Sequence, residues 1–206
     1  MIAVVASVVP VRPSSFDVLP LQPATEIRWT TNTIQIALSS SLTAPSPAIK
    51  TDSDVIGAVR RALASWSRVA NIKFVEVNSK AQSVSPVGRG DGINLITAAA
   101  TEENLALFNE GKATARTRVF FDTETGEISE ADIVLNPYPY SETGSVLQFS
   151  TDTTPGTYDL ESTLAHELGH LLGLNHSRVL GATMQASQAL NGTYGLNAIT
   201  ERTLSD

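Results

Sequence analysis

The sequence predicts an α+β fold with one twisted mixed β-sheet and two main helices. Short segments in which apolar residues alternate or run continuously are typical of strands. Two longer segments repeat apolar residues at the three- and four-residue spacing of helices. One helix follows the first strand, several strands come next, and the second helix comes last, which is the order expected around one mixed sheet.

Composition limits the classes of function. At 206 residues, with 42% hydrophobic and 17% charged residues, the chain fits one globular domain of ordinary size. Its net charge is -7 and its 14 Lys and Arg residues are scattered, which argues against nucleic acid as a partner. No apolar run reaches the roughly 18 residues needed to span a bilayer. The absence of cysteine excludes disulfides and thiolate metal ligands.

The first 28 residues are predicted to form a leader outside the domain. Pro10, Pro13, Pro20 and Pro23 lie there with little periodicity between them, which favours an extended or loosely docked segment. Residues 1–9 are apolar but short and have no preceding Lys or Arg, so they make a poor secretory signal. The domain proper is expected to begin near Trp29 and to occupy residues 29–206.

The elements follow in order from there. Strands are expected at residues 33–38, 72–77, 93–98, 117–121 and 131–135. A long amphipathic helix is expected at residues 52–70, where Val55, Val59, Leu63 and Trp66 recur at helical spacing. Acidic residues lie at its start and arginines later, which complements the helix dipole.

The second helix carries the candidate site. It is expected to begin near Asp159, a good N-cap, and to end at Gly173, a good residue for reversing the chain. At 100° per residue, His170 lies about 40° and Glu167 about 100° from His166, so the three side chains share one face. Leucines lie on the opposite face, which is expected to pack into the core. They are Leu160, Leu164, Leu168, Leu171 and Leu172.

These residues have the spacing of a zinc site. His166 and His170, one turn apart, can bind one ion through nitrogen, while Glu167 lies beside the metal and can hold a water. Gly173 allows the chain to turn so that His176 supplies a third ligand and one position stays open. Because these are the only 3 histidines, the chain can build one histidine zinc site.

At these residues the sequence resembles the metzincin metallopeptidases, whose zinc motif is followed by a methionine turn beneath the metal. Met184 lies downstream of His176 in Gly-Ala-Thr-Met, and the resemblance implies that it underlies the imidazoles. Ser177, directly after the third histidine, is similar to the matrixin branch. Ala186 stands where astacins and serralysins place a metal-binding tyrosine. The stretches around Trp29, residues 64–67 and residues 126–136 also resemble matrixins, the last of them bacterial matrixin-like proteins.

The resemblance implies a zincin-like fold and a zinc metalloendopeptidase. A zinc-activated water would attack the peptide bond, with Glu167 as general base and then general acid. It also implies a protein or peptide substrate and secretion from the cell. Calcium is a further expectation, for which Asp122, Glu124 and Asp132 are acidic candidates without assigned ligands.

Several features depart from the family pattern. No histidine remains for the second, structural zinc of animal matrixins, and no cysteine is present for a latency peptide. Gln185 and Ala186 replace the residues that help to wall the S1′ pocket. The family's closing helix would follow a segment such as residues 202–206, where this chain ends, so the domain is expected to lack that helix.

A second reading is a catalytically inactive, zinc-stabilised module for adhesion or recognition. Its best support is the tripeptide Arg89-Gly90-Asp91, although the flanking glycines favour an ordinary turn. Glu167 argues against it, because a structural zinc takes a fourth protein ligand and has no use for a base beside an open position.

Overall fold

A computed structural model describes residues 2–5, 26–109, 113–140, 144 and 146–191. Its centre is a six-stranded mixed sheet in the order β1-β5-β6-β4-β2-β3. The strands are β1 (Ile2–Val5), β2 (Thr33–Ser39), β3 (Lys73–Ser79), β4 (Leu95–Thr97), β5 (Ala115–Phe121) and β6 (Ile128–Leu135). Strand β2 runs parallel to β3 and β4, and β4 runs parallel to β6, whereas β5 runs antiparallel to β6 and β1.

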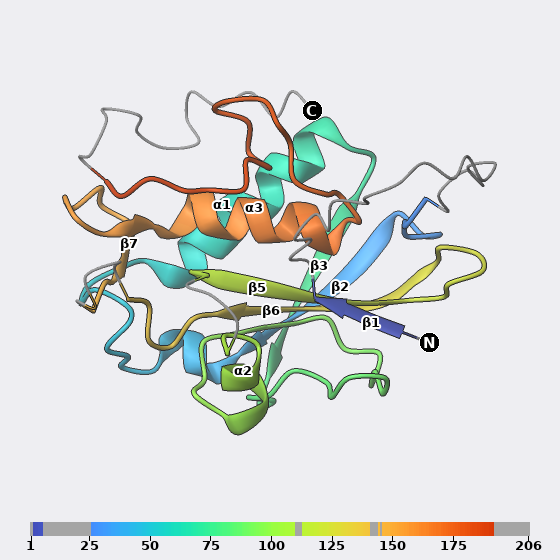
Figure 1. Ribbon diagram of the computed structural model, residues 1–206, viewed down its shortest axis with the longest axis horizontal. Coiled ribbons are helices and arrows are strands. Elements are labelled where there is room, and N and C mark those ends of the chain that lie inside the picture. The colour runs from blue at the N-terminus through green and yellow to red at the C-terminus, as the bar shows by residue number, and fades with distance from the viewer. Residues whose placement is uncertain (1, 6–25, 110–112, 141–143, 145, 192–206) are drawn as a thin grey trace, which may run out of the picture.

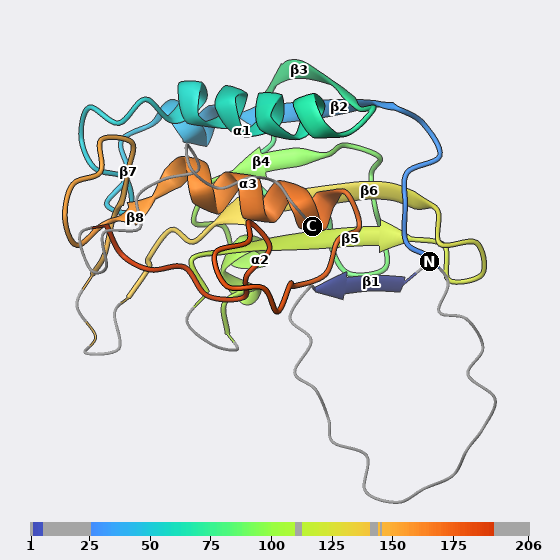
Figure 2. The same cartoon turned by 90° about the horizontal axis from the view of Figure 1, so that it is seen from above.

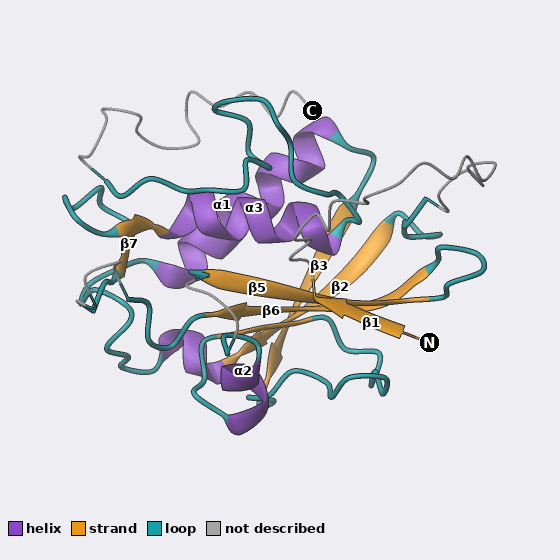
Figure 3. Ribbon diagram, viewed as in Figure 1, coloured by secondary structure: helices purple, strands orange, loops and turns teal. Residues whose placement is uncertain are grey.

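The helices cover both faces of this sheet (Figures 1 and 3). Helices α1 (Val55–Val69) and α3 (Leu160–Leu171) lie together on one face, and the short helix α2 (Glu102–Ala106) lies on the other. Seen from above in Figure 2, α3 follows the direction of β5, and it contacts both β5 and β6. The predicted α+β architecture with two main helices is confirmed. No helix among the described residues is long and apolar enough to cross a bilayer.

The main core lies between the sheet and the pair α1 and α3. Ile36, Ile96 and Ile133 of three neighbouring strands are fully buried there. Four leucines of α3, at positions 160, 164, 168 and 171, are also fully buried, while Leu172 is partly buried. Each fully buried leucine stabilises the fold by about 1.5–3 kcal/mol relative to an exposed one. The leucine face therefore holds α3 firmly against the sheet.

Five elements were not predicted from the sequence. These are β1, the 3-10 helix η1 (Ser40–Thr43), α2, and the two-stranded parallel sheet of β7 (Phe149–Ser150) and β8 (Tyr158–Asp159). Each has five residues or fewer, too short for periodicity to show. Strand β1 lies within the predicted leader, whose residues 6–25 are outside the described residues. Helix α1 begins later than expected because Asp52 has a positive φ of 68° and Asp54 serves as its N-cap.

Candidate metal centre

Helix α3 is held by caps and by two tryptophans. Its N-cap Asp159 accepts a hydrogen bond of 2.7 Å from the backbone N–H of Ser162, as its residue type predicted. The indole N–H of Trp66 donates to the carbonyl oxygen of Ala165 at 2.8 Å. The indole N–H of Trp29 donates to the carbonyl oxygen of Leu171 at 2.9 Å. The metal-ligand segment is therefore fixed at both ends.

Gly173 ends this helix and turns the chain back. Its φ is 96°, a left-handed conformation that favours glycine. A Cβ atom at this position would lie 2.2 Å from the carbonyl oxygen of Ile27, so a side chain is also sterically excluded. The backbone N–H of Leu174 donates to the carbonyl oxygen of Gly169 at 2.9 Å and completes the turn. The chain then brings His176 beneath the helix.

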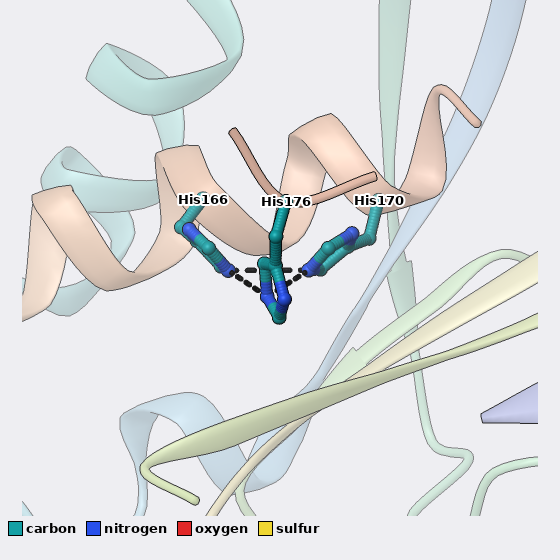
Figure 4. Close-up of side chains that lie close together, drawn as sticks. All are labelled: His166, His170 and His176. Carbon is teal, nitrogen blue, oxygen red and sulfur yellow. Dashed lines mark hydrogen bonds between the residues drawn. The ribbon is translucent and has the colours of Figure 1, made fainter. Parts of the chain in front are cut away.

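The three histidines converge on one point (Figure 4). Their Nε2 atoms lie 3.1 Å apart between His166 and His170, and 3.2 Å from each of these to His176. Nδ1 of His166 is 2.9 Å from the carbonyl oxygen of Thr183, and Nδ1 of His170 is 2.7 Å from that of Leu174. A carbonyl oxygen only accepts, so in both rings Nδ1 carries the proton and Nε2 presents its lone pair. Lone pairs that face each other cannot form a hydrogen bond, whereas both can bind a metal ion placed between them.

This arrangement fits zinc. Nitrogen ligands at 2.0–2.1 Å in a tetrahedral site would be about 3.3–3.4 Å apart, close to the separations seen here. Burial, followed by the neighbouring His166, lowers the pKa of His170 to about 4. The same two causes lower the pKa of His176. Both rings are therefore neutral near pH 7 and can bind a metal without first losing a proton.

Met184 packs against α3 at Gly169, next to His170. It is 1% exposed. A Cβ atom on Gly169 would lie 2.1 Å from Sδ of Met184 and 3.0 Å from the Trp66 ring. The backbone N–H of Ser177 donates to the carbonyl oxygen of Met184 at 2.8 Å and closes the loop between His176 and the methionine. Glycine between the two helical histidines is thus needed for this packing.

Glu167 lies beside the imidazoles and is 6% exposed. Its Oε2 accepts a hydrogen bond of 2.6 Å from the hydroxyl of Thr117 on β5. Burial raises the pKa of the Glu167 carboxyl, while His166, the Thr117 hydroxyl and Arg116 act in the opposite direction. A carboxyl with a raised pKa in a polar cavity is suited to exchanging protons near neutral pH.

A cavity of about 390 Å³ opens in front of this carboxylate and the three histidines. Residues 113–116 at the start of β5 form one wall, and residues 185–188 form another. Gln188 is fixed in the second wall, where its Oε1 accepts from the Thr163 hydroxyl at 2.7 Å and its Nε2 donates to the Asp159 carbonyl oxygen at 3.0 Å. Gln185 and Ala186 lie in the same wall, so this side of the cavity is polar or small rather than aromatic.

Comparison with known proteins identifies the family. The matrixin family model matches residues 28–198. The chain belongs to the matrixin family. This matrixin is also 29% identical over 167 residues to Metalloendoproteinase 1 of Glycine max, in a match that covers 78% of this chain. It spans 45% of the length of that relative. The resemblance drawn from the zinc motif and Met184 is therefore confirmed at the level of family and fold.

The other candidate sites of this matrixin do not form a metal cluster. Asp122 accepts from the backbone N–H groups of Glu124 and Thr125, both at 2.9 Å, and shapes a turn. Asp132 is 1% exposed and accepts from the backbone N–H groups of Ser85 and Leu95, also at 2.9 Å. Among the described residues, the three histidines form the one group of metal-binding side chains close enough to share an ion. The calcium expectation gains no support.

The Arg89-Gly90-Asp91 tripeptide of this matrixin lies in a loop between two turns. Gly88 and Gly92 on either side have φ angles of 77° and 79°. The backbone N–H of Arg89 donates to the carbonyl oxygen of Pro86 at 3.1 Å, and Oδ1 of Asp91 accepts from the backbone N–H of Ile93 at 2.9 Å. The turns therefore lie at the flanking glycines, and Gly90 between them is partly buried.

Sequence reasoning missed two residues of this matrixin's site, Thr117 and Gln188. Gln188 lies in an irregular segment that carries no periodic signal. Thr117 carried a signal, because it occupies a core-facing position of β5 between the apolar Ala115 and Val119. A polar side chain in such a row needs a hydrogen-bond partner, and the polar face of α3 offers one.

Proposed function

We propose that this chain is a zinc-dependent metalloendopeptidase. The observation that carries the proposal is the convergence of the Nε2 atoms of three imidazoles beside a buried carboxylate in an open cavity. Membership of the matrixin family and the similarity to a protein named as a metalloendoproteinase support the same activity. The proposed ligands are His166, His170 and His176, with Met184 as their apolar floor.

A zinc ion held by these histidines supplies a Lewis acid that acidifies water and polarises a peptide carbonyl. Glu167 has the role of general base and then general acid. Its carboxylate takes a proton from the attacking water as the new C–O bond forms. It returns the proton to the leaving amine nitrogen as the C–N bond breaks. No other carboxylate lines the cavity, so this proton transfer has one candidate among the described residues.

The proposed substrate is a protein or peptide, which membership of a peptidase family supports. Ala115 and Arg116 at the start of β5 line the cavity, together with His166, His170 and Glu167. A peptide bound in this cavity would therefore lie beside the start of β5.

The proposed organisation is a catalytic domain at residues 29–206 after a leader at residues 1–28. Secretion is proposed from the family. One ion, zinc, is proposed per chain, because the three histidines build one site.

Metal analysis combined with a proteolysis assay tests the proposal. The zinc-loaded chain is expected to hold one zinc by mass spectrometry and to cleave casein, and 1,10-phenanthroline should abolish cleavage. Glu167→Gln should keep its zinc and lose about 10²–10⁴-fold in kcat, the range associated with general acid–base catalysis. One zinc per chain with no cleavage would instead support the inactive recognition module. A Glu167→Gln protein as fast as the parent would remove Glu167 from the mechanism.

A further inference from the structure

The Thr117 hydroxyl has no role in the proposed mechanism, yet it donates a hydrogen bond to the carboxylate of Glu167. Oγ1 of Thr117 is 2.6 Å from Oε2 of Glu167 and 3.1 Å from the backbone carbonyl oxygen of the same residue. Thr117 is 1% exposed and Glu167 is 6% exposed. The contact is therefore shielded from water, where a hydrogen bond to a charged group contributes most.

The position of Thr117 in an apolar row indicates that its hydroxyl is there to hydrogen bond to Glu167. Side chains alternate along β5, so Thr117 faces α3 together with Ala115 and Val119, which belong to the main apolar core. Valine has almost the shape of threonine and would fill the same space without a polar atom. The Thr117 hydroxyl lies within hydrogen-bond distance of two acceptors of Glu167, its backbone carbonyl oxygen and its carboxylate.

We propose that Thr117 is a positioning residue that fixes the orientation of the Glu167 carboxylate. A hydroxyl has one hydrogen, and at 2.6 Å that hydrogen points to Oε2. Oε2 is thereby held against β5, and Oε1 is left to take the proton from water and return it to the amine. Thr117 neither gains nor loses a proton in the cycle.

The backbone carbonyl oxygen of Glu167, 3.1 Å from the Thr117 hydroxyl, is a second acceptor on the same residue. Thr117 therefore contacts both the side chain and the backbone of Glu167. This inference rests on the proposed peptidase function, because orientation of the carboxylate matters to catalysis only if Glu167 transfers protons.

Two substitutions at Thr117 separate the hydroxyl from the shape of the side chain. Thr117→Val keeps the shape and removes the hydroxyl, whereas Thr117→Ser keeps the hydroxyl. With casein-derived peptide as substrate, Thr117→Val should lower kcat by about 10–100-fold, the scale associated with small misplacements of reacting groups. KM and zinc content should change less than about twofold, since no ligand is touched. Thr117→Ser should recover most of the lost kcat.

A matched control comes from another buried threonine. Thr97 on β4 is fully buried, and its hydroxyl donates to the carbonyl oxygen of Gln82 at 2.8 Å, away from the cavity. Thr97→Val should lose stability as Thr117→Val does, but keep the parental kcat. The proposal is wrong if Thr117→Val retains the parental kcat, if Thr117→Ser is as slow as Thr117→Val, or if Thr97→Val loses as much kcat as Thr117→Val.

Crystal structures of the zinc-loaded variants test the orientation without an activity assay. In Thr117→Val the Glu167 carboxylate should rotate or occupy more than one conformation, whereas in Thr117→Ser it should stay as in the parent. A single parental orientation in Thr117→Val would overturn the inference even if the parent proved inactive. An inactive parent, by contrast, would overturn the proposed function, so the two failures are distinguishable.

Discussion

Two buried polar centres lie on opposite faces of the sheet, and adjacent residues of β5 reach them. Thr117 points toward α3, where it donates to Glu167. We call His166, His170, His176 and Glu167 the imidazole centre. Arg118 points to the other face, where it donates to the carbonyl oxygen of Ser85 and to Glu103 of α2. We call Arg118, Glu103, Asp132 and Glu130 the carboxylate centre; Ser85 links two of them, because its carbonyl oxygen accepts from Arg118 and its N–H donates to Asp132. The two-residue period of a strand lets one element serve both centres.

The centres differ in how their polar atoms are matched. In the carboxylate centre most acceptors meet donors: both oxygens of Asp132 accept from backbone N–H groups, and Oε2 of Glu130 accepts from that of Gly92 at 2.5 Å. Oε1 of Glu130 and Nε of Arg118 are buried without a hydrogen-bond partner among the described residues. In the imidazole centre, the Nε2 atoms of three histidines face one another. The imidazole centre is therefore suited to a cation, whereas the backbone hydrogen bonds of the carboxylate centre hold the β3–β4 connection without one. The four predictions below test this difference.

The largest effect is expected from removing zinc. At free zinc about 1,000-fold above its Kd, binding to the folded state stabilises it by about 4 kcal/mol. Chelation should therefore lower the free energy of unfolding by about that amount, measured by urea denaturation. Hydrogen exchange should accelerate at α3 and not at the amides of Ser85 and Leu95, which bond to Asp132. Equal acceleration at both centres would contradict their independence.

The next effect is expected from Arg118→Met, which leaves Glu103 and the carbonyl oxygen of Ser85 without the guanidinium that donates to them. Losing a hydrogen bond to a charged group costs about 1.5–3 kcal/mol, so urea unfolding should shift by that much while zinc content stays unchanged. Arg60→Met is the matched control, because Arg60 pairs with Glu76 at the exposed surface and should cost at most about 1 kcal/mol. Similar losses in the two variants would refute the structural role of the carboxylate centre.

Gly169→Ala should overpack the imidazole centre. The added methyl group meets Sδ of Met184, and such overpacking costs about 1–3 kcal/mol despite the better helix propensity of alanine. Zinc affinity, measured by competition with a chromophoric chelator, should fall as well. Combining Gly169→Ala with Met184→Ala should cost less than the sum of the single changes. Strict additivity would show that the two side chains do not interact.

The smallest effect concerns pH and the carboxylate centre. Burial, aided by the nearby charges of Glu130 and Asp91, raises the pKa of Asp132 to about 7, although its two backbone N–H partners act against this. Between its unfolded pKa near 4 and pH 7, the folded state binds a proton that the unfolded state lacks. The contribution of Asp132 to stability is therefore present at low pH and lost as pH rises through 7.

For Asp132 this linkage amounts to about 2 kcal/mol more stability at pH 5.5 than at pH 8. Urea unfolding is measured for the zinc-free parent and for zinc-free Asp132→Asn at both pH values. The difference between the two proteins isolates the contribution of Asp132, because all other titratable groups are common to both. The parent should gain about 2 kcal/mol more than the variant on acidification. Parallel pH profiles would show that Asp132 does not titrate in this range.

The sequence predicted the elements whose signals are local. The N-cap Asp159, the leucine face of α3 and the turn at Gly173 each follow from a residue type and its spacing, and the structure has all three. The ligand spacing also depends on one helix and one turn. These features could be predicted because they lie within one contiguous stretch of chain.

The features that the sequence did not predict depend on contacts between distant segments. Thr117 and Glu167 are 50 residues apart, and Asp132 bonds to Ser85 across 47 residues. From the sequence, Asp132 was a candidate calcium ligand. In the structure, backbone N–H groups of Ser85 and Leu95 bind both of its oxygens, which its position in the sequence does not show. Pairing across the sheet, rather than composition, decides which polar residue becomes structural and which faces the site.

The two tryptophans described above give the molecule a built-in optical reporter. The chain has 2 tryptophans, and both indole N–H groups donate to carbonyl oxygens of α3, next to His166 and His170. Indole emission responds to the polarity and hydrogen bonding of its surroundings, so the fluorescence of the unlabelled protein follows the seating of the ligand-bearing helix. Intrinsic tryptophan fluorescence can therefore report metal loading, substrate binding and unfolding without a probe attached to the chain.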